Sequence, residues 1–295
     1  MNLQLWEDIQ TRGGVTALTG RTILRLTGED RVRFLNGQIT NDVRKLTPGV
    51  AMQALVTDLK AHIMAEVFAH TAEDGALYLD AEPSLRESLA ARLERYIIAD
   101  DVELTDVTDD YSIWHIFGPA AAAVPGNLSV SRLKQDGVDL WLPKAATPPD
   151  IDAPNLSESD FEAMRILKHV PRHPAELNER AFPAEAGLQQ SAISFAKGCY
   201  IGQEIISRMK LTGKMPRVLM AWEAEGTAPT PGQVLLTADG SSEAGFITSA
   251  TVHPLTGKAC GLAYVKQSLA VPDSLLLASA EAPNIPEQVR IFPHD

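Results

Sequence analysis

The stretch that most limits the possible fold follows Pro216. From there on, short apolar runs alternate with turns that contain glycine or proline. The apolar runs are Val218–Trp222, Val234–Leu236, Gly245–Ser249, Gly261–Val265 and Ser274–Leu277. Short runs bounded by turn residues are typical of β-strands, whereas a helix needs a longer periodic pattern. We therefore expect residues 216–295 to form an all-β C-terminal module, a small barrel or sandwich.

Residues 1–215 mix helices with hairpin-linked strands. A helix is expected from Pro83 to about Tyr96, because leucines recur at nearly every fourth position between them. Strand-like runs occupy 22–26, 54–57, 63–70, 76–81, 102–107 and 112–117. This mixture predicts an α+β fold more than a doubly wound parallel sheet. The Pro-, Ala- and Asp-rich segment 144–156 is expected to be a surface linker between two subdomains.

Composition excludes several classes of protein. The formal net charge of −12 argues against a broad basic surface, so we expect no direct nucleic-acid binding. No apolar stretch approaches the roughly 20 residues of a membrane span, and no signal-peptide pattern opens the sequence. Cys199 and Cys260 make neither a disulfide framework nor a cluster-ligating set, and we expect no metal site. These features predict a cytoplasmic protein without a membrane segment.

A second helix is expected to begin after Ser157, whose spacing to Asp160 resembles a capping box. It should end before Pro171, because the residue before a proline disfavours helical geometry. Glu162 and Arg165 lie three positions apart on this helix. Two interpretations remain open for them: a surface ion pair, or a carboxylate and a guanidinium that point into a ligand cleft.

The octapeptide at 197–204, KGCYIGQE, leads from a loop into a helix expected from Gly202 to about Lys210. Cys199 therefore precedes a helix N-terminus, and Lys197 is two residues away. The helix dipole and a nearby ammonium both favour a thiolate, so the pattern is compatible with a reactive sulfur. The alternative is an inert cysteine buried in a tight turn, because free cysteines are among the most buried residues.

The octapeptide resembles the signature of the YgfZ-type folate-binding proteins. These belong to the superfamily of the glycine-cleavage T-protein, an aminomethyltransferase. Residues 25–42 resemble the N-terminal signature of this superfamily, and 245–249 with 261–265 resemble its closing β-module. Arg165 with the preceding Glu162 matches an arginine-bearing helix of the T-proteins. The resemblance implies an α+β fold whose subdomains surround a central folate-binding cavity, followed by a small β-barrel.

Tetrahydrofolate, or a one-carbon derivative of it, is the cofactor that this resemblance implies. The residues expected to bind it are Glu204, Gln203, Arg165, Glu162, Glu66 and Asn41. The carboxylates among them are candidate acceptors for the adjacent N–H groups of the pterin, in two parallel hydrogen bonds. The guanidinium of Arg165 suits the carboxylates of the folate tail. For Glu66, an outward-facing glutamate on a strand is the alternative interpretation.

One departure from the T-protein pattern bears on the reaction. T-proteins carry paired acids in a Gly-Gly-x-x-Asp-Asp stretch, and the aligned segment here is 61–66. Ala65 replaces the first acid, Glu66 stands at the second, and the glycines are absent. Glycine-cleavage activity is therefore not expected from this chain.

Three functions remain open at this stage. The first is a folate-binding accessory protein for the assembly or repair of iron–sulfur clusters in client enzymes, including tRNA-modifying ones. Its partners would be a reduced folate and the client or assembly proteins, with Cys199 as a redox-active or cluster-contacting thiol and Lys197 lowering its pKa. The second is a folate-dependent aminomethyl or one-carbon transferase. The third is a non-enzymatic interaction protein with a vestigial cavity.

Overall fold

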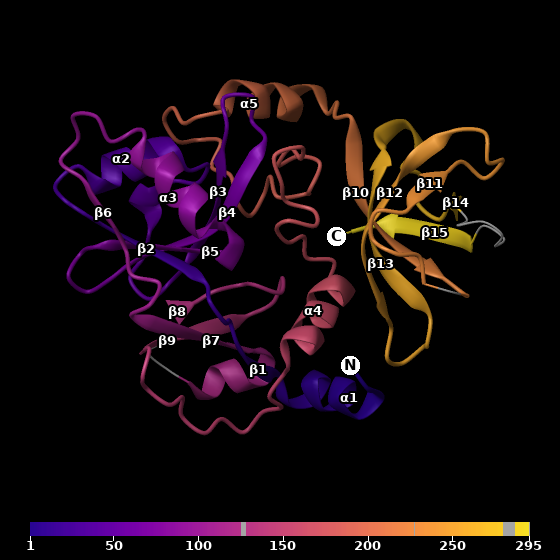
Figure 1. Cartoon of the computed structure of the whole chain (residues 1–295), viewed down its shortest axis with the longest axis horizontal. Helices are drawn as coiled ribbons and strands as arrows, with labels where there is room; N and C mark the ends of the chain where they lie inside the picture. The colour runs from indigo at the N-terminus through magenta and orange to yellow at the C-terminus, as the bar shows by residue number, and fades with distance from the viewer. Residues whose placement is uncertain (125–127, 227, 280–286, 295) are drawn as a thin grey trace.

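The computed structural model describes residues 1–124, 128–226, 228–279 and 287–294. In these ranges the strands form two open sheets and one closed barrel. Figure 1 shows the first sheet at the upper left, the second sheet below it and the barrel on the right. Helix α4 (Glu158–Leu167) lies between the second sheet and the barrel. The predicted α+β architecture with a closing β-barrel is confirmed.

The first sheet has the strand order β3-β4-β5-β2-β6, and all neighbouring strands are antiparallel. Its members are β2 (Thr22–Thr27), β3 (Met52–Thr57), β4 (Ile63–Thr71), β5 (Leu77–Ala81) and β6 (Glu103–Asp106). Helices α2 (Arg31–Gln38) and α3 (Arg86–Glu94) pack on one face over a core of buried aliphatic side chains. The strands expected from the sequence in this region all form.

A bulge in β4 decides which side chains face the helices. The register between β3 and β4 shifts where Val56 pairs with Ala65 and Thr57 with Ile63, so Met64 is the extra residue. A bulged residue is unpaired and redirects its side chain. Met64 and Ala65 consequently both contact the helix-covered core, and Glu66 takes the opposite face.

The second sheet has the order β1-β7-β9-β8. It consists of β1 (Gly14–Ala17), β7 (Tyr111–Phe117), β8 (Leu128–Ser129) and β9 (Gly137–Pro143), again antiparallel. Helix α1 (Leu3–Arg12) precedes β1 and is capped by Asn2, whose side chain accepts from the Leu5 N–H. Of these elements, the sequence patterns predicted β7 alone.

Between the second sheet and the barrel, the chain is largely irregular. Residues 144–156 lead to α4, where Ser157 and Asp160 form the predicted capping box. A long segment without helix or strand then runs to α5 (Gln203–Thr212). Short 3₁₀ turns occur at η1 (Val43–Lys45), η2 (Pro83–Leu85), η3 (Gly118–Ala123) and η4 (Gln267–Leu269). Among the described residues, none of the helices has the length and apolar character that a membrane span requires.

The C-terminal barrel closes in the order β10-β13-β12-β11-β14-β15. Its strands are β10 (Arg217–Ala224), β11 (Val234–Leu236), β12 (Glu243–Val252), β13 (Ala259–Lys266), β14 (Leu275–Ala278) and β15 (Glu287–Pro293). The interior is filled by buried apolar side chains around Trp222, whose indole N–H donates to the Leu262 carbonyl. Closure leaves no sheet edge to pair with another chain. The barrel predicted after Pro216 is confirmed, and the domain boundaries stay a prediction.

A chain of buried and partly buried ion pairs joins the two sheets, α4 and the barrel. In order along the network, the groups are Asp139, Arg132, Asp80, Arg21, Glu82, Arg172, Glu162, Arg165, Glu176 and Ser249. Each arginine of this network lies between two carboxylates, so every charge in the network has a partner of opposite sign. Such pairs are costly to break, because the remaining charge would stay buried without compensation.

The Asp139 end of this network predicts how the protein responds to acid. Burial opposes ionisation of Asp139, but the Arg132 guanidinium and the His115 ring beside it lower its pKa to about 2. A carboxylate with a depressed folded-state pKa stabilises the fold above about pH 4, and this stability is lost as the pH falls through 2. We expect Asp139 alone to account for about 2 kcal/mol of lost unfolding free energy across that window.

Urea unfolding of the wild type and of Asp139→Asn at several pH values checks this prediction. The variant should be less stable at pH 6, but its stability should change less between pH 4 and pH 2. Equal slopes in the two proteins would show that Asp139 does not carry the acid sensitivity.

Candidate functional site

A central cavity lies where the first sheet, the second sheet, α4 and the segment after α4 meet. Its inner chamber has a volume of about 80 Å³ and is lined by residues of all four parts. An outer chamber of about 840 Å³ adjoins it and shares Phe68, Arg132, Val170 and Pro171 with it. Side by side, they give a small inner chamber and a larger outer one. This shape suits an elongated ligand with a flat head and a longer tail, of the size that small-molecule sites accept.

Glu66 offers the cavity a carboxylate with an unused acceptor. It lines the inner chamber, and one of its oxygens accepts from the Gln53 side-chain amide at 2.6 Å. Its other oxygen has no hydrogen-bond donor among the described residues. Burial raises the pKa of Glu66, and the hydrogen bond from Gln53 opposes that shift. The group can therefore accept from a buried N–H donor of a ligand, or hold a proton there.

Aromatic rings form part of the same wall. Phe68 is buried on β4, two residues beyond Glu66 on the same face, and lines both chambers. The guanidinium of Arg132 lies over its ring, with Cζ 4.2 Å from the ring centre. Phe161 of α4 lines the inner chamber as well. A planar ligand would find a carboxylate and aromatic surface close together at this end.

Arg165 also lines the inner chamber, but its donors are engaged within the protein. A guanidinium has five N–H groups. The five hydrogen bonds of Arg165 go to Glu162 (two of them), the Val170 carbonyl, Glu176 and the Ser249 hydroxyl. The side chain is buried and holds α4 to the barrel strand β12. The expected contact between Arg165 and a folate tail stays a prediction, and a ligand would have to displace one of these partners.

Glu162 is part of the same arrangement. Its carboxylate accepts from Arg165 and from Arg172, with the Arg172 contact at 3.1 Å. Burial favours the neutral acid, but the hydrogen bonds from these two arginines lower the pKa of Glu162 overall. The predicted Glu162–Arg165 ion pair forms, and of the two residues Arg165 lines the inner chamber. That Glu162 binds a ligand stays a prediction.

Asn41 lines the outer chamber. Its side-chain amide donates to the carbonyls of Gln53 and Ser191, and its Oδ1 accepts from the Asp42 N–H. These bonds fix the turn at the mouth of the cavity. Asn41, Glu66 and Arg165 thus line the two chambers from three separate parts of the chain, and Glu162 is held beside them through its ion pair with Arg165.

Cys199 lies elsewhere, on the outer surface. It is exposed in the loop before α5 and lines a wide, open depression together with Gln203 and Glu204. In Figure 1, α5 spans the upper edge of the molecule, away from α4. None of the three lines either chamber of the central cavity. The structure therefore divides the predicted site residues into a cavity group and a surface group.

Glu204 and Gln203 have no contact with the central cavity. The Glu204 side chain is largely exposed, and it pairs with Arg208 one turn further along α5. Gln203 is the first residue of that helix. With Glu204 on the outside, Glu66 is the predicted carboxylate that is best placed to meet a ligand in the cavity.

The ammonium group of Lys197 is bound to backbone carbonyls and is not free to contact the Cys199 sulfur. Its side chain is buried, and Nζ donates to the carbonyls of Asn36, Ile39 and Asn41 at 2.6, 2.8 and 2.6 Å. These carbonyls end α2 and start the turn after it, so the cation caps the helix C-terminus. Burial lowers the pKa of Lys197 to about 8. The prediction that Lys197 lowers the Cys199 pKa stays a prediction, and the observed contacts give the lysine an anchoring role.

The structure shows why position 202 of the octapeptide is a glycine. It caps α5 in the left-handed region, with φ of 86°. A β-carbon there would lie 2.8 Å from Thr57 Oγ1 in the β3–β4 hairpin. The Thr57 hydroxyl also donates to the Ile201 carbonyl. The loop that carries Cys199 is thus held against both the hairpin and α2, which positions the thiol rigidly at the surface.

Sequence reasoning missed several residues of the cavity wall. Phe68, Arg132, Arg172 and Gln53 all line it or hold its charged groups in place. Phe68 could have been found, because it shares a strand face with Glu66 at period two. Arg132 and Arg172 lie in irregular segments with no local pattern, and only the folded chain brings them to their carboxylates.

The two cysteines should differ strongly in reactivity. Cys260 is partly buried, and burial with the nearby Glu223 raises its pKa to about 11. At pH 8 only about 0.1% of it is thiolate, the form that reacts. We expect a disulfide reagent such as DTNB to modify Cys199 at least about 100-fold faster than Cys260. Cys199→Ala should leave a single slow phase, and a fast phase in that variant would contradict the assignment.

Comparisons with known proteins agree with this geometry. The sequence model of the GCVT N-terminal domain matches residues 6–140. The structure of glycine cleavage system aminomethyltransferase T from Bartonella henselae superposes with a TM-score of 0.84 at 16% identity, covering 99% of this chain and 89% of that one. Residues 6–140 are thus similar to the GCVT N-terminal domain, and the whole chain shares the fold of that aminomethyltransferase.

Curated relatives of two kinds are similarly distant. The aminomethyltransferase of Rubrobacter xylanophilus is 26% identical over 291 residues, which cover 88% of this chain and 77% of that protein. The mitochondrial iron–sulfur cluster assembly factor IBA57 homolog of Phaeosphaeria nodorum is 26% identical over 217 residues, covering 68% and 53%. This chain thus spans about half the length of that IBA57 relative. Identity alone does not favour one kind of relative over the other.

Proposed function

We propose that the central cavity binds a reduced folate, tetrahydrofolate or a one-carbon derivative. The free Glu66 oxygen would accept from the pterin N–H edge, and Phe68 would contact the ring face. The tail would extend through the outer chamber past Asn41. The two-chamber shape and the chemistry of the inner wall support this proposal.

We further propose that the protein is an accessory factor in the assembly or repair of iron–sulfur clusters. The observation that carries this proposal is the exposed Cys199, held in a shallow depression outside the cavity. A thiol in that position is accessible to a partner protein and is not placed to act on a ligand in the cavity. The similarity to IBA57 homologs and the alanine at position 65 support the same reading. The two free thiols are compatible with a cytoplasmic location.

Calorimetric titration with tetrahydrofolate under reducing conditions tests the cavity proposal. Glu66→Gln removes the charged acceptor and should weaken binding by about tenfold or more, since a charge-assisted hydrogen bond contributes roughly 1.5–3 kcal/mol. Glu204→Gln is the matched control on the outer surface and should bind like the wild type. No saturable binding by the wild type, or an equal loss in both variants, would contradict the assignment of Glu66.

A cellular assay tests the role of the thiol. In a strain that lacks this protein, activity of an iron–sulfur-dependent tRNA-thiolating enzyme should be restored by the wild type and by Cys260→Ala. Cys199→Ala should restore it poorly, although the variant binds tetrahydrofolate normally. Full restoration by Cys199→Ala would remove Cys199 from the mechanism.

A folate-dependent aminomethyl transferase is the second candidate, because the aminomethyltransferase relatives align over most of this chain. Against it stands Ala65, a buried residue on the face of β4 away from the central cavity. An assay for methylene-tetrahydrofolate formation from an aminomethyl donor decides between the two. Turnover that is abolished by Glu66→Gln would favour the transferase over the accessory role.

A further inference from the structure

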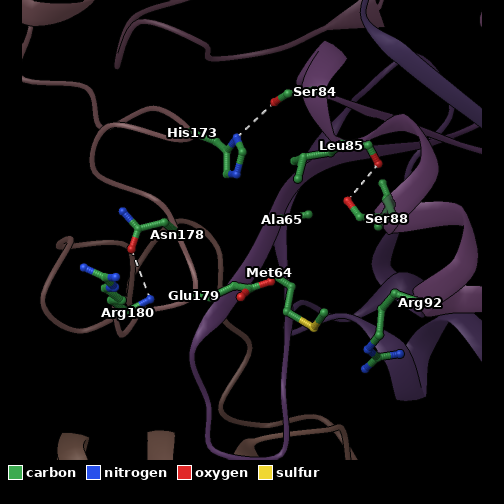
Figure 2. A pocket seen from close by; sticks show the side chains of 11 residues that line it. Met64, Ala65, Ser84, Leu85, Ser88, Arg92, His173, Asn178, Glu179 and Arg180 are labelled. Carbon is green, nitrogen blue, oxygen red and sulfur yellow. Dashed lines mark hydrogen bonds between the residues drawn. The ribbon is translucent and has the colours of Figure 1, made fainter.

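A second cavity lies on the other side of β4 from the central cavity. We call it the α3 pocket; it has a volume of about 450 Å³. It is lined by Met64, Ala65, Ser84, Leu85, Ser88, Leu89, Arg92, His173, Asn178, Glu179 and Arg180. Figure 2 shows the β4 and α3 side chains facing the segment after α4 across the pocket. Successive residues of β4, Ala65 and Glu66, line different cavities, so the strand separates them.

Arg92 gives this pocket an unusual feature. Its side chain is buried, 8% exposed, yet it forms no ion pair with any carboxylate in the described part of the chain. Two of its five N–H groups donate to neutral oxygens, Gln38 Oε1 at 3.0 Å and the Thr57 carbonyl at 3.1 Å. The remaining N–H groups have no acceptor among the described residues. Its guanidinium also lies over the Tyr96 ring.

The other buried arginines show how this protein normally treats such a charge. Arg21, Arg132 and Arg165 each form ion pairs with at least two carboxylates, and Arg165 uses all five of its donors. Buried charges are normally paired, because an isolated one is strongly unfavourable. Arg92 is therefore a cation whose missing partner would come from outside the chain. The carboxylate of the pocket itself, Glu179, does not take this place.

The rest of the lining indicates what kind of anion fits. Leu85, Leu89 and Ala65 are buried and form an apolar floor, and the flexible thioether of Met64 lies beside it. The hydroxyl of Ser84 contacts His173 Nδ1 at 3.3 Å, at the opposite side from Arg92. An inorganic anion would engage the cation but leave the floor uncovered. A molecule with an apolar body and one acidic end satisfies both.

We propose that the α3 pocket binds a small organic carboxylate, with its carboxylate on Arg92 and its apolar body against Met64 and Leu85. This pocket is a separate site from the proposed folate site, because no lining residue is shared between the pocket and the central cavity. The carboxylate accepts from the N–H groups that the protein leaves unused, in the fork geometry that guanidinium groups favour.

Ser88 allows a test that keeps Arg92 in place. It lies four residues before Arg92 on α3 and lines the same pocket. Ser88→Glu would supply the missing carboxylate from within the chain, in the favourable i,i+4 order and in the first turn of the helix. Ser88→Gln has the same shape without the charge. The glutamate variant should melt at a higher temperature than the glutamine variant, and the difference should shrink to the small contribution of the helix N-terminus when Arg92→Gln is added to both.

Ligand binding is measured by NMR on protein with ¹³C-labelled methionine methyl groups. The chain has seven methionines, and the Met64 signal is identified with Met64→Leu. Benzoate should shift the Met64 signal saturably, whereas the uncharged benzamide and inorganic phosphate should not. Affinity for benzoate should fall by about tenfold or more in Ser88→Glu, the loss expected for a blocked charge-assisted contact, and stay within about twofold in Ser88→Gln.

Several results would overturn the inference. If benzamide bound as tightly as benzoate, the charge on Arg92 would play no part in binding. If phosphate bound as tightly, the apolar floor would not contribute to recognition. Blocking by Ser88→Gln would show that shape decides and that the Arg92 assignment is wrong. Displacement of benzoate by tetrahydrofolate would assign the pocket to the same ligand as the cavity. Failure of folate to bind the central cavity, with benzoate still bound here, would affect the proposed function alone.

Discussion

Replacing Arg165 with methionine is expected to lower the free energy of unfolding by about 3–5 kcal/mol. The change removes five hydrogen bonds and leaves Glu176, which is fully buried, without its cationic partner. It also separates α4 from Ser249 on the barrel. Urea unfolding followed by tryptophan fluorescence measures the effect.

Two controls make this prediction specific. Arg208→Met breaks an exposed i,i+4 pair with Glu204 and should change stability by less than about 0.5 kcal/mol. Adding Glu176→Gln to Arg165→Met should recover part of the loss, because the unpaired buried charge is then gone. If Arg165→Met alone were as stable as the wild type, the ion-pair network would contribute nothing to stability.

The second large effect is expected from Lys197→Met, a loss of about 3 kcal/mol or more. Three backbone carbonyls at the end of α2 would lose a charged donor in a buried place. The loop that carries Cys199 would lose its anchor to α2, so hydrogen exchange should accelerate in residues 36–41 and 194–202. Methionine keeps the apolar stem of the lysine, so the loss of stability measures the contribution of the ammonium group.

Lys214→Met is the matched control, because Lys214 is exposed just after α5 and substitution there removes the same charge. It should leave stability and exchange unchanged within about 0.5 kcal/mol. If Lys197→Met also left stability and hydrogen exchange unchanged, Lys197 would have no structural role. The proposal that it lowers the pKa of Cys199 would then be favoured.

Local patterns predicted the elements that depend on local interactions. The helix at 158–167 was foreseen from Ser157 and Asp160, since a capping box is formed by residues three positions apart. The barrel was foreseen from its runs and turns. Helix α1 was missed although Asn2 caps it and apolar residues recur along it, so the signal was present in the sequence.

Elements whose stability depends on distant partners were not predictable in this way. Strand β9 carries Asp139 at a fully buried position, which contradicts an apolar strand pattern. Arg132 and His115 compensate that charge, and the pattern makes sense only with them in place. The same holds for the candidate site. Residues 165 and 204 appeared equivalent as ligand contacts in the sequence, but one lines the cavity and the other faces solvent.

The order of strands along the chain has a consequence for synthesis on the ribosome. All strands of the first sheet lie between residues 22 and 106, whereas the second sheet joins β1 to β7, pairing Val15 with Ile116. The first sheet can therefore form while the chain is still being synthesised, and β1 stays unpaired until β7 has been made. Domains tend to fold as units as the chain emerges. The second sheet contains the first strand to emerge, β1, but it would be completed only after the first sheet, which lies between β1 and β7 in the sequence. Pausing translation once residue 106 has emerged from the ribosome should yield a nascent chain in which the first sheet is already protected from protease and the second is not.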